Sequence, residues 1–250
     1  MELFDRLVGY YLRKRAYSRN RRLMKWFHAE PLVSFSFDDF PASAYHQGSS
    51  ILRKYGLHGT YFISMGLLGK QTPVGQIASL EETQRILDEG HELGCHTYDH
   101  LDACQTNRGL FENSIARNLT AIKNHFPTAT IKSFSYPYYE PHPRNKKVSE
   151  KYFLFCRGGG QHINTHVLDL NLLRSVFIDK KSRADINYYK HLFQMNKELR
   201  GWLIFTTHDV SESPSDYGVQ PHFLEQVINL SLESGARVLP IRDMEEHLAL

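Results

Sequence analysis

Long hydrophobic runs are absent from this sequence of 250 residues. None approaches the roughly 20 residues that a membrane-spanning helix needs, and no apolar core precedes a small-residue cleavage site. Cysteine is scarce, and the three present, Cys95, Cys104 and Cys156, have neither an even count nor the spacing of a metal finger. These absences argue against a membrane-spanning or disulfide-rich protein. They predict free thiols in a reducing compartment, so we expect a cytoplasmic protein.

The sequence also lacks a strong overall charge, since its formal net charge is only +3. Basic residues gather at the start, where residues 1–30 hold eight Lys and Arg against three Asp and Glu. The remaining chain is slightly acidic and carries no basic stripe, so nucleic acid is not an expected partner. Hydrophobic content is 41% and charged content 23%, and no repeat, linker or low-complexity tract interrupts the chain. This composition indicates a globular body.

Residues 1–30 form the first predicted unit, a basic N-terminal arm. Apolar residues recur there at helical spacing, namely Leu3, Phe4, Leu7, Val8 and Tyr11. A helix is therefore predicted. Two roles fit a basic amphipathic helix. It packs on the body with a solvated basic face, or it lies on an anionic membrane surface, which would place the protein peripherally at the inner membrane face.

A buried strand that ends in two acids opens the second predicted unit, residues 31–250. Residues 32–37 (LVSFSF) form an apolar, aromatic-rich run, and Asp38, Asp39 and Pro41 follow closely. Such a run suits a strand covered on both faces of a parallel sheet. Acids at its carboxyl end would lie at the rim where α/β sheets and barrels place their active sites. The alternative is a solvated turn or a helix cap.

Strands and helices keep alternating through residues 31–250, which predicts one α/β domain with a parallel sheet, open or closed into a barrel. A capping box at Ser79 to Glu82 marks the start of one helix, and Gly90 marks its end. The predicted helices cover residues 42–55, 80–89, 109–125, 221–233 and 241–248. The predicted strands cover residues 60–63, 92–95, 131–135, 153–156, 174–177, 202–206 and 236–239.

His96 and His100 are four residues apart, so on a helical turn their rings would face the same side and could share a metal ion. With one acid of the Asp38-Asp39 pair they would make a two-His, one-carboxylate face that leaves coordination positions open for water and substrate. The other acid would stay free to take a proton from an activated water. On an extended chain, neighbouring acids point in different directions, which would separate these two tasks.

His208 follows another predicted buried strand and is a candidate general acid, because the pKa of histidine lies near neutrality. The alternative is a hydrogen-bonded core histidine.

These features lie in an order that resembles a known family, the polysaccharide deacetylases of the NodB homology domain, carbohydrate esterase family four. The resemblance runs from about Leu32 to the C-terminus. Residues 36–39 (SFDD) resemble the first family motif, T-F-D-D, and residues 96–100 (HTYDH) match the second, H-[ST]-x-x-H. Residues 134–138 (FSYPY) resemble the third motif, R-x-P-Y, and residues 205–208 (FTTH) the fifth.

The resemblance implies a fold, a site and an activity. The fold would be an irregular, incomplete (β/α) barrel of about seven to eight parallel strands. Asp39, His96 and His100 would hold a divalent metal, usually zinc, with cobalt, nickel, manganese and iron as alternatives. The remaining roles would be general base for Asp38, oxyanion donor for the backbone N–H of Tyr138, and general acid for His208.

The chain departs from the family pattern at several positions, which indicates a divergent branch. Phe40 replaces the glycine that commonly follows the paired acids, and Ser135 replaces the arginine of the third motif, which orients the base. Arg157 or Arg174 could supply that arginine. The fourth motif, which tunes the acid histidine, is not recognisable, and Asp179 is a weak candidate for its acid.

Three functional hypotheses follow. The first is a metal-dependent hydrolase that removes an N-acyl group, acetyl above all, from an amino sugar in an intracellular glycan or surface-polysaccharide precursor. The second is an amidohydrolase acting on a small non-sugar amide or ureide, which a closed pocket would favour and a long aromatic groove would disfavour. The third is a non-catalytic binding protein on the same fold.

Overall fold

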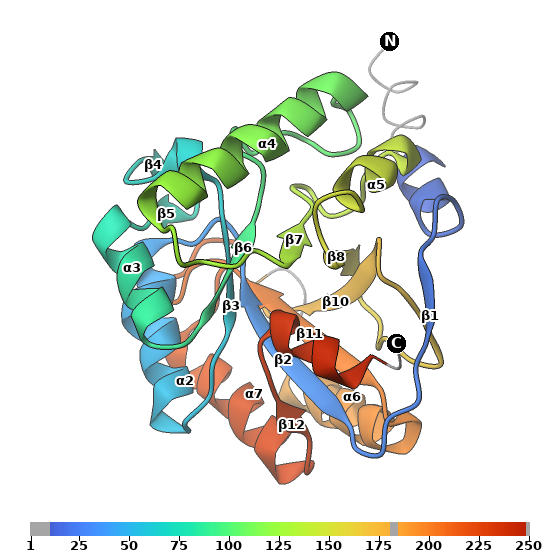
Figure 1. Cartoon of the computed structure of the whole chain (residues 1–250). Helices are drawn as coiled ribbons and strands as arrows, with labels where there is room; N and C mark the ends of the chain where they lie inside the picture. The colour runs from blue at the N-terminus through green and yellow to red at the C-terminus, as the bar shows by residue number, and fades with distance from the viewer. Residues whose placement is uncertain (1–10, 181–184, 249–250) are drawn as a thin grey trace.

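Seven parallel strands form a closed barrel at the centre of the computed structural model, which describes residues 11–180 and 185–248 (Figure 1). In pairing order they are β2 (Leu32–Phe37), β3 (Thr60–Ile63), β6 (Glu92–Cys95), β7 (Ser133–Ser135), β8 (Phe155–Gly160), β10 (Leu173–Phe177) and β11 (Trp202–Thr207). An eighth strand, β12 (Arg237–Val238), pairs with the start of β2. The predicted irregular (β/α) barrel of seven to eight parallel strands is confirmed, with its ring closed rather than incomplete.

Pairing around the ring is uneven. Between β11 and β2 it runs without interruption from Trp202 opposite Leu32 to Thr207 opposite Phe37. Between β6 and β7 a single residue pair, Cys95 with Phe134, joins the strands. The ring is therefore most extensively paired at the β11–β2 join and least at the β6–β7 join.

The apolar run of β2 forms a strand because both of its faces are covered, and all six of its residues are buried. On one face Leu32 packs with Trp202 and with apolar side chains of β3, β8 and β10, which fills the barrel interior. On the other face Phe35 and Phe37 belong to the core shared with α6 and α7. The acids after Phe37 are thereby fixed at the carboxyl end of the most embedded strand.

Helices surround the barrel, with α4 lying across the top of the view in Figure 1 and α6 and α7 below. Four predicted helices lie where expected, and α3 begins with the predicted capping box at Ser79. The helices are α2 (Ser50–Lys54, preceded by a π-helical segment at Ala44–Ser49), α3 (Leu80–Asp88), α4 (Arg108–His125), α5 (Pro143–Ser149), α6 (Ile186–Leu199) and α7 (Pro221–Glu233). The sequence did not predict α5 or α6.

Several short elements differ from the predictions. Residues 241–248, predicted as a helix, form a 3-10 helix at Ile241–His247, and another 3-10 turn covers Met65–Leu67. β8 extends to Gly160, past its predicted end, because its glycines admit close neighbours: a Cβ on Gly158 would lie 2.6 Å from the carbonyl oxygen of Tyr139. Two antiparallel ribbons were not predicted, β1 (Leu23–Lys25) with β9 (Val167–Asp169) and β4 (Gln71–Thr72) with β5 (Gly75–Gln76).

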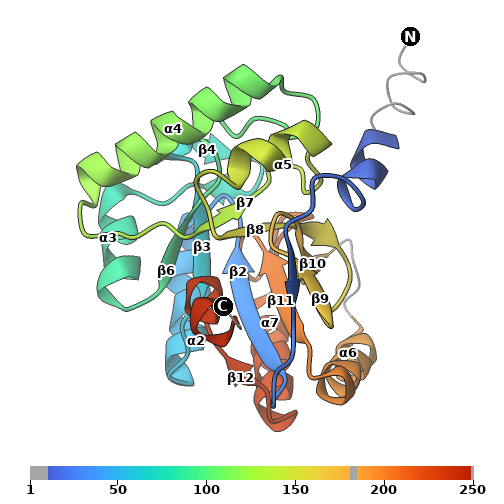
Figure 2. The same cartoon turned by 45° about the vertical axis from the view of Figure 1, so that its right-hand side comes forward.

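The described part of the N-terminal arm packs on the barrel. Most of the predicted arm helix falls on residues 1–10, outside the described residues, and residues 11–16 are helical. In both views these residues lie beside α5, and β1 then runs down the outside of the barrel (Figure 2). Trp26 is buried and stacks on Trp202 with ring centroids 6.0 Å apart. Membrane contact by the arm stays a prediction, and no helix within residues 11–180 and 185–248 is long and apolar enough to cross a bilayer.

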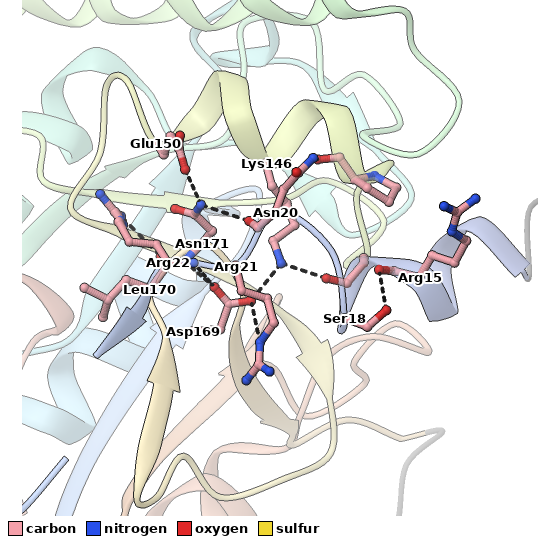
Figure 3. A network of polar contacts seen from close by, with 12 residues as sticks. Arg15, Ser18, Asn20, Arg21, Arg22, Lys146, Glu150, Asp169, Leu170 and Asn171 are labelled. Atoms are coloured by element: carbon pink, nitrogen blue, oxygen red, sulfur yellow. Dashed lines mark hydrogen bonds and ion pairs between the residues drawn. The ribbon is translucent and has the colours of Figure 1, made fainter. Parts of the chain in front are cut away.

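A polar network fixes the arm to the barrel (Figure 3). The ammonium of Lys146 in α5 donates to the carbonyl oxygen of Ala16 and to the carboxylate of Asp169, each at 2.7 Å. The backbone N–H of Arg22 donates to the same carboxylate, at 3.0 Å. Since the side chain of Lys146 is fully buried, this pairing holds a charge out of water and ties arm, α5 and β9 together.

His91 predicts an acid-sensitive stability. The ring is fully buried, its Nδ1 accepts the Gly59 N–H at 2.9 Å, and burial lowers the pKa of His91 to about 3. Below the unfolded-state pKa of about 6.5, this histidine is protonated in the unfolded chain but stays neutral in the folded chain. The free energy of unfolding therefore falls by up to about 1.4 kcal/mol per pH unit as the pH drops towards 3.

The variant His91→Asn, whose amide oxygen can accept the same N–H, should flatten this slope. Urea unfolding of both proteins between pH 7 and pH 4 measures the two slopes. Parallel slopes would contradict the prediction.

Candidate active site

The two acids after β2 lie on a turn rather than on an extended chain. Asp39 and Phe40 have left-handed backbones, with φ of 60° and 54°. This corrects the prediction of an extended pair, and it explains why glycine suits the position of Phe40. The Phe40 ring is instead held by burial, 4.9 Å from the ring of Tyr61. The turn sends Asp38 to one set of partners and Asp39 to another.

His96 and His100 come together without a helix. The segment after β6 is a loop in which Thr97 and His100 have φ of 61° and 52°, so the predicted helical turn is wrong. The loop still brings the two rings to a centroid distance of 5.0 Å. Ser114 of α4 supports this loop, because its hydroxyl accepts hydrogen bonds from the N–H groups of Tyr98 and Asp99. The spacing thus predicted the proximity but not the conformation.

Asp39, His96 and His100, here called the Asp-His-His cluster, converge on one point. Their ligand atoms all lie within 4.8 Å of one another. The Oδ1 atom of Asp39 is 3.5 Å from Nε2 of His96 and 3.0 Å from Nε2 of His100. Two ligands of one tetrahedral zinc ion, each at about 2.0–2.1 Å, stand about 3.3 Å apart. The cluster therefore fits a divalent ion.

Two further observations support that fit. Oδ1 of Asp39 is buried and makes no hydrogen bond of good geometry within the described chain, as expected of an atom reserved for an ion. The Nδ1 atom of His96 lies 2.8 Å from the carbonyl oxygen of Ser135, the outer contact that metal-binding histidines usually make. Burial lowers the pKa of His96 to about 4, which keeps its ring neutral. Neutral imidazole is the form that binds metal.

Asp38 is paired with Arg157. The guanidinium donates from Nη2 to Oδ1 of Asp38 and to the hydroxyl of Ser135, and both side chains are buried. Burial alone would raise the pKa of Asp38, but attraction to Arg157, His96 and His208 outweighs it and lowers that pKa. Asp38 is therefore ionised, with Oδ2 left outside the Arg157 contact.

The structure chooses between the two candidate arginines. Arg157 in β8 pairs in register with Ser135 in β7, so its side chain fills the space that the small serine leaves. Its guanidinium also lies 5.1 Å from the ring centroid of Phe62. Arg174 instead lies over the ring of Tyr17, at 4.1 Å.

Tyr138 lies on a second left-handed turn. Tyr138 and Tyr139 have φ of 60° and 74°, and the Tyr139 N–H donates to the carbonyl oxygen of Tyr136 at 2.9 Å. The N–H of Tyr138 has no acceptor among the described residues. The ring of Tyr138 is half exposed and lies 5.1 Å from the ring of His100.

His208 follows β11 directly and lies beside Tyr217, with ring centroids 5.6 Å apart. Asp209 shapes the intervening loop, since its carboxylate accepts the N–H of Ser215 at 2.8 Å and the Ser215 hydroxyl at 2.5 Å. Gly218 is required there, because a Cβ would lie 2.3 Å from the Asp209 carboxylate. Asp179, the candidate for tuning His208, lines a neighbouring cavity of about 460 Å³ with Glu212 and His222.

All six predicted site residues line one open cavity of about 680 Å³. Its lining also includes the turn of the β4–β5 ribbon and two further tyrosines, Tyr139 and Tyr217. A volume of this size suits a small ligand or part of a longer one. Arg13 is among the lining residues that sequence reasoning missed, because nothing in the pattern of the arm indicates where it packs.

A comparison with known proteins finds a matching family and two related proteins. A family model described as polysaccharide deacetylase matches residues 28–152. A bifunctional xylanase/deacetylase of Pseudobutyrivibrio xylanivorans is 35% identical over 109 residues, covering 44% of this chain and 17% of that protein. A peptidoglycan-N-acetylglucosamine deacetylase of Bacillus cereus is 32% identical over 87 residues, covering 34% of this chain and 37% of that protein. The chain thus matches well under half the length of either relative.

Solved structures share the fold. An acetyl xylan esterase of Clostridium thermocellum, solved with a cobalt ion, superposes with a TM-score of 0.60 at 19% identity, over 86% of this chain and 90% of that one. A pseudoenzyme of carbohydrate esterase family 4 from Bacillus anthracis has a TM-score of 0.60 at 15% identity, over 88% of this chain and 67% of that one. Neighbours that share this fold thus include both a protein described as an esterase and one described as a pseudoenzyme.

Proposed function

The chain belongs to the polysaccharide deacetylase family, and on that premise we propose that it is a metal-dependent hydrolase that removes an N-acyl group, acetyl above all, from an amino sugar. The observation that carries the proposal is the Asp-His-His cluster with a second carboxylate, that of Asp38, beside it in one cavity. A structural metal site would have no use for an adjacent buried acid that keeps one oxygen uncommitted.

Each side chain suits one part of amide hydrolysis. A divalent ion in the Asp-His-His cluster would polarise the acyl carbonyl and lower the pKa of an adjacent water. Asp38 accepts the proton of the attacking water on Oδ2, because Arg157 holds Oδ1. The N–H of Tyr138 donates to the carbonyl oxygen as negative charge develops there. His208 supplies a proton to the departing amine nitrogen.

The rim of the cavity favours a sugar over a small amide or ureide. The cavity is open, and the tyrosines at its edge, Tyr138 and Tyr217, are 54% and 38% exposed. Aromatic faces at a wet rim suit the apolar faces of sugar rings. A closed pocket would have favoured the second hypothesis. The Bacillus anthracis neighbour makes the non-catalytic hypothesis worth testing directly.

The setting of the reaction is a proposal as well. We propose that it takes place in the cytoplasm, on a glycan or surface-polysaccharide precursor. For a lipid-linked substrate, we propose peripheral membrane contact through the arm. Cell fractionation with an antibody to the full chain would locate it, and recovery only from the culture medium would overturn this placement.

The activity is tested by metal analysis and acyl release together. The purified protein should contain about one divalent metal per chain. It should release acetate from at least one member of a panel of N-acetylated oligosaccharides, sugar nucleotides and lipid-linked sugars. Chelation should abolish release, and adding back zinc or cobalt should restore it.

Two controls sharpen this result. O-acetylated xylo-oligosaccharides, run beside the panel, separate amide hydrolysis from ester hydrolysis. A metal-loaded protein that releases no acyl group from any sugar would overturn the proposal in favour of the non-catalytic hypothesis.

A further inference from the structure

Arg13 of the N-terminal arm bridges two loops of the active site. Its Nη1 atom donates to the carbonyl oxygens of Tyr138 at 2.9 Å and Glu140 at 3.2 Å. Its Nη2 atom donates to the carboxylate of Asp102 at 2.9 Å. One guanidinium therefore ties the turn that presents the Tyr138 N–H to the loop that follows His100.

Both loops need such support. Two successive non-glycine residues with positive φ, Tyr138 and Tyr139, cost on the order of 1 kcal/mol or more each and persist only where surrounding contacts hold them. Arg13 binds the carbonyl oxygen of Tyr138, within this pair, and that of Glu140, directly after it. On the other loop, Asp102 accepts the N–H groups of Cys104 and Gln105, so it fixes the turn directly after His100.

The arm can hold these two loops in place because the arm itself is fixed by other contacts. The Tyr17 hydroxyl donates to the carboxylate of Glu140 at 2.5 Å, a second bond from the arm to the same turn. The Ala16 carbonyl is held by the buried ammonium of Lys146. The Arg13 side chain is only 27% exposed, and it lines the site cavity. Its geometry is therefore set by packing rather than by solvent.

We propose that Arg13 of the N-terminal arm is a positioning residue, which holds the Tyr138 turn and the His100 loop in register. This inference rests on the proposed function, because it assigns Arg13 an effect on acyl transfer through Tyr138. A donor that is aligned with the oxyanion stabilises the transition state more than the bound substrate. Loss of Arg13 should therefore lower kcat and leave KM nearly unchanged.

The test compares Arg13→Met, which keeps the length of the chain but removes the donors, with Arg13→Lys. Complete loss of an oxyanion donor costs roughly 10² to 10³ in kcat, so a displaced donor in Arg13→Met should cost about tenfold to a hundredfold. Arg13→Lys should recover part of this loss, since an ammonium can bond one carbonyl oxygen. Metal content should stay at that of the wild type in both variants.

Asn20→Ala is the matched control, because Asn20 anchors the arm to Pro143, at 2.8 Å, without belonging to the residues that line the cavity. Its kcat should stay within about twofold of the wild type. A kcat of Arg13→Met equal to that of Asn20→Ala would overturn the inference. A raised KM with unchanged kcat would also overturn it, since Arg13 would then be a substrate contact.

Amide hydrogen exchange provides a readout that needs no substrate. Peptides covering residues 136–142 and 100–106 should exchange faster in Arg13→Met than in the wild type or Asn20→Ala. If the wild type released no acyl group, the proposed function would fail while exchange still decided whether Arg13 orders the two loops. If both peptides of Arg13→Met exchanged at the wild-type rate, the inference would be overturned whatever the measured activity.

Discussion

Replacing Asp38 with asparagine is expected to lower acyl release by about 10² to 10⁴ while the metal stays bound. Asparagine keeps an oxygen for Arg157 but cannot take a proton from water. The cluster of Asp39, His96 and His100 is untouched, so metal content should match that of the wild type. Parallel measurements of kcat and of metal per chain check the prediction.

The neighbouring substitution Asp39→Asn is the matched control, since it makes the same chemical change one residue along the chain. It should lose most of the metal, because a neutral amide oxygen is a weaker ligand than the carboxylate oxygen Oδ1, which lies 3.5 Å and 3.0 Å from the two Nε2 atoms. If Asp38→Asn lost the metal and Asp39→Asn kept it, the assignment of base and ligand would have to be exchanged. Equal metal loss in both would show that the pair acts as one ligand unit.

Replacing Arg157 with methionine is expected to destabilise the fold by about 3–5 kcal/mol, because it leaves the buried charge of Asp38 without its partner. The same change frees the Asp38 carboxylate to rotate, so residual kcat should fall as well. Urea unfolding and kcat at a temperature where the variant is folded measure the two effects separately.

The double variant Asp38→Asn with Arg157→Met tests the physical cause. Removing both charges together should destabilise less than the sum of the single changes, by more than about 1 kcal/mol, because neither partner is left as an unpaired buried ion. Additive losses would mean that Arg157 stabilises the barrel through its contacts with Phe62 and Ser175 instead. Arg174→Met, which changes an arginine outside this pair, is the control.

Local sequence was sufficient to predict where β2, β6 and β7 end and, within one residue, where β11 ends, but not where β8 ends. The apolar run 32–37 specifies a fully buried strand, so Asp38 and Asp39 had to lie at its rim. The same logic placed His96 after β6 and His208 after β11. These residues come close together because the strands are parallel, which puts all of their carboxyl ends on one side of the barrel.

The loop conformations could not be predicted, because their cause is not local. Thr97, His100 and Tyr138 have no intrinsic preference for positive φ, and contacts from α4, from Asp39 and from the arm hold them there. The sequence left two candidate arginines as the partner of Asp38. Only the register of β7 with β8, which sets Arg157 opposite Ser135, identifies Arg157 as that partner. Arg13 lies about 125 residues in sequence from the turn it binds, and no periodicity reports such a contact.

The single residue pair between β6 and β7 has a consequence for the local opening of the barrel. With one residue pair across it, this join should open at a lower free energy than the β11–β2 join. His96 spans the join through its contact with the Ser135 carbonyl oxygen. Any ligand that fixes the His96 ring therefore also raises the cost of opening, and occupancy of the site becomes coupled to the cooperativity of the whole barrel.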